Sequence, residues 1–251
     1  MDFLKSIVIS FSFFTTIPMP MIEWTDKRMK YVPLILPLVG IFIGGLAFGL
    51  LKLLSVLNTG SMLGAVILSV FFIAITGGVH MDGLMDSADA YFSRREKERK
   101  LEIMKDSRVG AFAVIIFVIV ILMKTAFLYE LLESGKEFGI LLFFIPVISR
   151  CLQPSMLYFF PYAKEEGLAK MYGGELKKTM GIIPLVLLLV ATAIMIFTNG
   201  ISALIIPGIA AFYYCFYYLS SKKNFGGITG DLLGAFLEVS EMLMIGAILF
   251  V

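Results

Sequence analysis

The chain has 251 residues, 59% of them hydrophobic, and a mean hydropathy of +0.93. This apolar content excludes a soluble enzyme and predicts an integral membrane protein. The formal net charge is only +2 and no basic groove emerges from the sequence, which argues against nucleic acid as a partner.

Seven apolar runs approach or exceed the roughly 20 residues that a helix needs to cross a bilayer. We expect these spans near 31–57, 62–79, 110–129, 138–158, 181–198, 201–219 and 232–251. The earlier segment 3–17 is short and precedes Pro18 and Pro20, so we expect an interfacial or re-entrant piece, with an eighth span as the alternative. The predicted fold is an all-α polytopic membrane bundle that forms one catalytic domain over residues 1–251.

Lysine and arginine gather before the first expected span and then in every second loop. They are Lys27, Arg28 and Lys30, then Arg94, Arg95, Lys97, Arg99, Lys100, Lys105 and Arg108, then Lys164, Lys170, Lys177 and Lys178, and last Lys222 and Lys223. The other loops are short and hold one lysine among them. Basic loops stay in the cytoplasm, so the pattern predicts a multi-pass protein of the cell membrane with its motifs on the cytoplasmic side.

An acidic stripe follows the second expected span. Asp82, Asp86 and Asp89 stand at positions i, i+4 and i+7, which share one face of a helix. Carboxylates at this spacing suit Mg²⁺, which usually needs substrate phosphates to complete its shell. The alternative is a solvated helix start favoured by the helix dipole. His80, the only histidine, precedes the stripe and is either structural or able to handle a proton.

Two further cytoplasmic motifs could bind phosphate. In the first, Lys105 and Arg108 flank Asp106, which is either another metal ligand or a partner that orients the arginine. The alternative for this pair is a positively charged membrane anchor. The second motif is a glycine-rich stretch that enters the last span and offers backbone N–H groups to an anion, or is only a flexible turn. It comprises Gly226, Gly227, Ile228, Thr229, Gly230 and Asp231.

Charged residues also occur within the expected spans, where they are costly. Glu238 and Glu241 lie in the last span and could bind a second metal, supply a base or pair with Arg150. Arg150 itself either snorkels to the interface or binds phosphate or a carboxylate. Lys124 lies nearer the outer side, and we expect a snorkelling or structural charge.

The longer motifs together resemble the cobalamin synthase family, the adenosylcobinamide-GDP ribazoletransferases. The stretches that carry the resemblance are GGVHMDGLMDSADAYF (77–92), RKLEIMKDSRVGAF (99–112) and GGITGDLLGA (226–235). The resemblance implies a Mg²⁺-dependent transferase in the membrane that joins adenosylcobinamide-GDP to α-ribazole or its 5′-phosphate. The products would be GMP and adenosylcobalamin or its 5′-phosphate, the last assembly step of vitamin B12 (cobalamin) synthesis.

Carried onto this sequence, the resemblance places the metal on Asp82, Asp86 and Asp89 and assigns the glycine-rich stretch to the nucleotide or a phosphate. The general base stays open among Asp86, Asp89 and Asp231. The competing readings are another Mg²⁺-dependent membrane phosphotransferase or prenyltransferase, and an ion-coupled transporter with carboxylates near the bilayer midplane. The sequence leaves the oligomeric state open, a homo-oligomer included.

Overall fold

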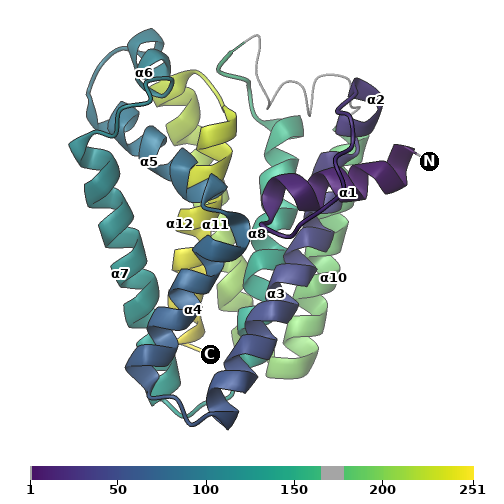
Figure 1. The fold of residues 1–251 in the computed structure, drawn as a ribbon, viewed down its shortest axis with the longest axis vertical. Helices are drawn as coiled ribbons and strands as arrows, with labels where there is room; N and C mark the ends of the chain where they lie inside the picture. The colour runs from purple at the N-terminus through teal and green to yellow at the C-terminus, as the bar shows by residue number, and fades with distance from the viewer. Residues whose placement is uncertain (1, 165–177) are drawn as a thin grey trace.

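A computed structural model describes residues 2–164 and 178–251, and in these ranges the chain is a helical bundle (Figure 1). The only strand-like pairing in the described part is an isolated bridge between Tyr162 and Ile228. The helices are α1 (Asp2–Phe14), α2 (Asp26–Met29), α3 (Val32–Val56), α4 (Ser61–Thr76), α5 (Val79–Phe92), α6 (Lys97–Ile103), α7 (Ala111–Glu133), α8 (Gly139–Phe159), α10 (Ile182–Asn199), α11 (Ile205–Phe225) and α12 (Gly230–Ile248), with 3₁₀ turns η1 (Lys178–Gly181) and η2 (Ile201–Leu204).

Two buried helices, α8 and α12, form the centre of the bundle. Helix α8 packs against α3, α10 and α12, and helix α12 packs against α5, α7, α8 and α11. Most side chains of both central helices are buried, whereas α7, α10 and α11 expose large apolar side chains outward, as lipid-facing helices do. The predicted fold class, an all-α polytopic membrane bundle, is confirmed.

Fewer helices than predicted meet the length and hydropathy of a membrane span. Among the described residues five do so, namely α3, α7, α8, α10 and the stretch Ile201–Phe225. A sixth exists only if α4 and α5 are taken as one span broken by a bend of 93°. The expected last span corresponds to α12, which carries three carboxylates and lies inside the protein, where protein rather than lipid surrounds them.

The N-terminal segment lies across the bundle rather than along it (Figure 1). Helix α1 has 13 residues and is therefore only about 20 Å long, too short for a hydrocarbon core of about 30 Å. Backbone Thr16 N–H donates to the Ile75 carbonyl at 2.9 Å, which ties the segment to the end of α4. The alternative of an eighth span is thus excluded, and the interfacial or re-entrant placement fits the geometry.

The basic loops gather at one end of the bundle (Figure 1), as the charge pattern predicts. We call this the basic end: it carries α2, α6 and the connections at residues 160–164 and 226–229. A hydrogen bond of 3.3 Å from Lys100 Nζ to Asn224 Oδ1 joins α6 to the last turn of α11. Lys170 and Lys177 lie outside the described residues.

Candidate functional site at the basic end

A pair of glycines turns the acidic stripe away from the apolar helix that precedes it. Gly77 and Gly78 both adopt left-handed φ values, +62° and +75°, which favour glycine over other residues. Helix α4 therefore stops at Thr76, and α5 sets off at 93° to it. This bend places α5 outside the spanning helices and directs its acidic face to the basic end.

Helix α5 crosses α12 at very short range, and two glycines allow the approach. A Cβ atom on Gly83 would lie 2.7 Å from the Asp231 carbonyl oxygen, and one on Gly234 would lie 3.0 Å from the His80 carbonyl oxygen. Gly83 therefore serves helix packing. The crossing brings Asp231 beside the acidic stripe.

The carboxylates of this crossing are close enough for their charges to interact. Burial, reinforced by the charges of Asp82, Asp231 and Asp89, raises the pKa of Asp86 to about 6. Asp82 is exposed, and Asp86 and Asp231 are half-buried, so the group is accessible from outside. Within the described residues no three His, Cys, Asp or Glu side chains are close enough to hold a metal ion by themselves.

Asp89, predicted as the third metal ligand, caps helix α7 instead. Its Oδ2 accepts a hydrogen bond from Gly110 N–H at 2.6 Å, and its Oδ1 accepts one from Ala113 N–H at 2.9 Å. A Cβ on Gly110 would lie 2.5 Å from the carboxylate, so glycine is needed there. Asp89 thus satisfies free N–H groups at a helix start and fixes α5 against α7.

Lys105 and Arg108, the predicted phosphate-binding pair, have different partners in the structure. Arg108 binds Asp106 through its guanidinium at 2.6 Å, and this bond lowers the pKa of Asp106 to about 2. Asp106 therefore orients the arginine, one of the two roles expected for it. Lys164 is close enough to Asp231 for their charges to interact, so Lys164 lies beside the acidic crossing, and Lys105 lies near Lys164. The sequence marked Lys164 only as a loop cation.

The glycine-rich stretch is mainly structural. A Cβ on Gly227 would lie 2.2 Å from the Pro161 carbonyl oxygen, and Ile228 N–H donates to that oxygen at 2.8 Å. Gly226 has a φ of +82° and ends α11. Thr229 caps α12, since its Oγ1 accepts from Leu232 N–H at 3.2 Å. The predicted ligand roles of Gly226, Gly227 and Thr229 are therefore corrected, while Gly230 remains open.

Arg150, predicted to bind phosphate, is paired deep inside the bundle. It is 1% exposed, and its Nη1 lies 2.7 Å from Glu241 Oε1, which also accepts from Ser149 Oγ at 2.8 Å. Glu238 pairs in the same way with Lys124 at 2.5 Å. The phosphate role of Arg150 is wrong, and so is the snorkelling alternative for both cations, because buried charges require partners.

A small cavity of about 120 Å³ opens beside the carboxylates. Asp82, Gly230 and Asp231 line it, together with the buried side chains of His80 and Gln153. His80 is buried, and its ring stacks on Phe14 with 5.7 Å between centroids. Burial, together with the positive charges of Arg150 and Lys124, lowers the pKa of His80 well below its usual value, so the ring is neutral at pH 7.

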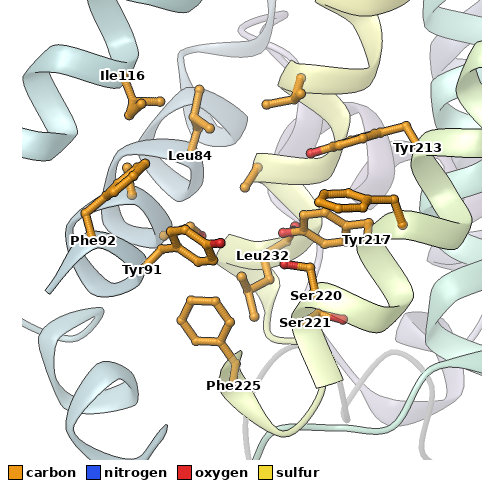
Figure 2. A pocket seen from close by; sticks show the side chains of 15 residues that line it. Leu84, Tyr91, Phe92, Ile116, Tyr213, Tyr217, Ser220, Ser221, Phe225 and Leu232 are labelled. Carbon is orange, nitrogen blue, oxygen red and sulfur yellow. Dashed lines mark hydrogen bonds between the residues drawn. The ribbon is translucent and has the colours of Figure 1, made fainter. Parts of the chain in front are cut away.

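A larger cavity of about 280 Å³ is lined by the later turns of α5, from Leu84 to Phe92. Figure 2 shows Tyr91 and Phe92 of α5 on one side of it, opposite Tyr213 and Tyr217 of α11, with Leu232 of α12 between them. None of Asp82, Asp86, Asp89 and Asp231 lines this cavity. The smaller cavity is therefore the one that adjoins the candidate chemistry.

Residues 6–249 match the family described as cobalamin-5-phosphate synthase. The chain belongs to this family. It is therefore a transferase of cobalamin biosynthesis, in line with the resemblance of its motifs. No solved structure matches the chain.

Curated relatives match the chain over almost its whole length, and they carry the name adenosylcobinamide-GDP ribazoletransferase. One from Clostridium perfringens is 38% identical and covers 98% of this chain and 99% of the relative. One from Lachnoclostridium phytofermentans is 36% identical over 97% of this chain and 92% of the relative. One from Halalkalibacterium halodurans is 33% identical over 97% and 94%.

Proposed function

We propose that this chain joins adenosylcobinamide-GDP to α-ribazole, or to its 5′-phosphate, and releases GMP at the basic end. The family match and the names of the relatives support the donor and the ribazole acceptor. One structural observation carries the proposal: the α5–α12 crossing gathers Asp82, Asp86 and Asp231 beside Lys164, and Lys105 lies near that lysine. A site with carboxylates for a divalent cation and ammonium groups for phosphate oxygens suits a diphosphate donor.

The donor set of the crossing fits Mg²⁺. Its groups are all carboxylates, and the pKa of Asp86 is raised by burial and by neighbouring negative charges that a cation would neutralise. We propose Asp82, Asp86 and Asp231 as the residues that hold the ion, with substrate phosphates completing its shell because the side chains alone do not enclose it. When bound, Mg²⁺ would neutralise charge on the diphosphate and on the leaving GMP.

The nucleophile is a ribose hydroxyl other than the 5′ one. An acceptor that already carries a 5′-phosphate keeps it in a cobalamin 5′-phosphate product, so its 5′-oxygen is not free to attack. The hydroxyl oxygen bonds to the phosphorus attached to cobinamide, the bridging P–O bond breaks, and GMP leaves with that oxygen. A carboxylate of the crossing takes the hydroxyl proton as the general base, with Asp86 and Asp231 as the candidates.

Lys105 and Lys164 hold the non-bridging oxygens of the diphosphate. Lys164 lies near Asp231 and Lys105 lies near Lys164, whereas Arg108 is paired with Asp106 and Arg150 with Glu241. Transfer of this kind depends mostly on in-line positioning and charge neutralisation. We also propose that the basic end faces the cytoplasm of the cell membrane, on the side where lysine and arginine concentrate.

The structure supports neither of the two competing functions, an ion-coupled transporter and a transferase with another donor. A transporter needs an acid within the membrane that is free to bind an ion, yet Glu238 and Glu241 are both paired with buried cations. A phosphotransferase for another diphosphate donor would keep the acids of α5. That function does not explain why the start of α12 carries the family's motif. An activity assay with each donor distinguishes the two functions.

The test uses purified protein in phospholipid vesicles with adenosylcobinamide-GDP and each acceptor. We expect GMP release that needs both substrates and stops in a chelator, and an Asp82→Asn variant that folds but loses about a hundred-fold or more of the rate. Asp106→Asn, an exposed acid outside the crossing, is the control and should stay within about three-fold. Turnover of a CDP-alcohol or a prenyl diphosphate in place of the cobinamide donor would overturn the proposal.

A further inference from the structure

The small cavity beside the carboxylates is lined mostly by apolar side chains. They come from α1, α3, α5, α8 and α12 and comprise Phe13, Phe14, Val32, Pro33, Leu36, Val79, Pro154, Leu157 and Leu233. Asp82 and Gly230 are exposed and Asp231 is half-buried, so the cavity opens to the outside beside these residues. A ligand part that enters the cavity must therefore be apolar at its inner end and must emerge next to the reacting groups.

Two buried polar atoms on side chains that line this cavity have no hydrogen-bond partner. They are His80 Nε2 and Gln153 Oε1, on side chains that are 3% and 4% exposed. Neither side chain is loose, since His80 stacks on Phe14 and Gln153 donates from Nε2 to the Leu233 carbonyl at 3.3 Å. Unsatisfied buried groups are costly, so a ligand that pairs with them gains both affinity and orientation.

We propose that this cavity receives the aromatic base of the acceptor, a flat benzimidazole ring, with His80 and Gln153 as its recognition residues. The inference rests on the proposed function and adds the place of the acceptor to it. The fused ring and methyl groups of such a base match the apolar walls, and its single free ring nitrogen can accept a hydrogen bond from His80 Nε2–H. Gln153 Oε1 then accepts from a ribose hydroxyl.

The guanine of the donor fits the same cavity poorly. Guanine carries a carbonyl oxygen, a ring N–H and an amino group along one edge, and each needs a partner when buried. The walls supply only His80 and Gln153 for these groups, while the carboxylates at the mouth are occupied with the diphosphate. A base seated in the cavity instead leaves its ribose at the mouth, beside Asp82 and Asp231, where a ribose hydroxyl must attack.

The first test narrows the cavity and measures each substrate separately. Val32→Phe should raise the acceptor KM about ten-fold or more, leave the donor KM unchanged, and shift preference from the dimethylated base toward unsubstituted benzimidazole. The matched control is Val239→Phe, which narrows the larger cavity (Figure 2) and should leave the base preference unchanged. A rise in the donor KM alone would place guanine there and overturn the inference, as would an unchanged base preference.

The second test leaves the size of the cavity unchanged and alters the acceptor instead. An acceptor whose free ring nitrogen is replaced by C–H should lose about ten-fold or more in kcat/KM with the unmodified enzyme. In His80→Phe, which keeps an aromatic ring against Phe14, the two acceptors should react equally well. An equal preference for the nitrogen in both proteins would overturn the role of His80. GMP release by the unmodified enzyme in the same preparation would still support the proposed function, whereas its absence would overturn both.

Discussion

At the scale of single residues, the acids of α5 divide into two kinds although they share one stripe. Asp82 is exposed at the crossing with α12 and Asp86 is half-buried there, whereas both oxygens of Asp89 accept backbone hydrogen bonds from the start of α7. The spacing in the sequence is compatible with either role. What separates them is which atoms of a neighbouring helix meet each carboxylate.

Asp86 should make the metal-free protein less stable as the pH rises. Its folded pKa of about 6 lies above the ordinary 3.8, so the stability that protonation provides is present at low pH and is lost as the pH rises from about 4 through about 6. Asp86→Asn removes the ionisable carboxyl and with it this loss of stability at higher pH. In chelator, the melting temperature of the variant relative to the unmodified protein should therefore be higher at pH 7 than at pH 4. A difference that does not change with pH would contradict the raised pKa of Asp86.

The capping of α7 by Asp89 can be tested by changing Gly110, whose N–H donates to the Asp89 carboxylate. Gly110→Ala puts a Cβ where the Asp89 carboxylate lies and should cost about 1–2 kcal/mol of stability, the usual effect of losing a helix cap. Thermal unfolding in detergent measures this cost. Gly45→Ala is the control, because an added Cβ in α3 meets nothing within 4 Å and should be nearly neutral. Equal melting temperatures for the two variants would refute the capping role.

At the scale of helices, two buried ion pairs, made by Glu238 and Glu241, hold α12 in the bundle. Glu238 pairs with Lys124 of α7, and Glu241 pairs with Arg150 of α8. These pairs fix the rotation of α12 and hence the direction in which Asp231 points at its other end. We interpret the intramembrane charges as structural on this ground.

Arg150→Met should leave Glu241 unpaired in the core and destabilise the protein by about 3–5 kcal/mol. The double variant Arg150→Met with Glu241→Met should recover most of that stability, because a buried pair can be replaced by apolar side chains of similar volume. Denaturation and GMP release are measured on both variants. Activity that returns with stability supports the structural role, whereas a stable but inactive double variant would return Arg150 to the phosphate-binding residues.

At the scale of the whole molecule, the sequence predicts the bundle, the basic end and the motifs that meet there. Hydropathy and loop charge depend on the environment of each segment, lipid or water, and both can be read locally. The bend at Gly77 and Gly78, the contact of Gly83 with Asp231 and the proximity of Lys164 depend instead on contacts between segments far apart in the chain. For that reason the spacing of three aspartates predicted a metal site on one helix, while the structure divides the candidate site between two.

The magnesium dependence of GMP release tests most directly whether the candidate metal site is shared between α5 and α12. The account predicts that Asp231→Asn raises the Mg²⁺ concentration for half-maximal rate about ten-fold or more, because it removes a proposed ligand. Asp89→Asn should lower stability but leave that concentration within about three-fold. If Asp89→Asn shifts the Mg²⁺ requirement and Asp231→Asn does not, the ion is held by the single stripe of α5, and the two-helix site is contradicted.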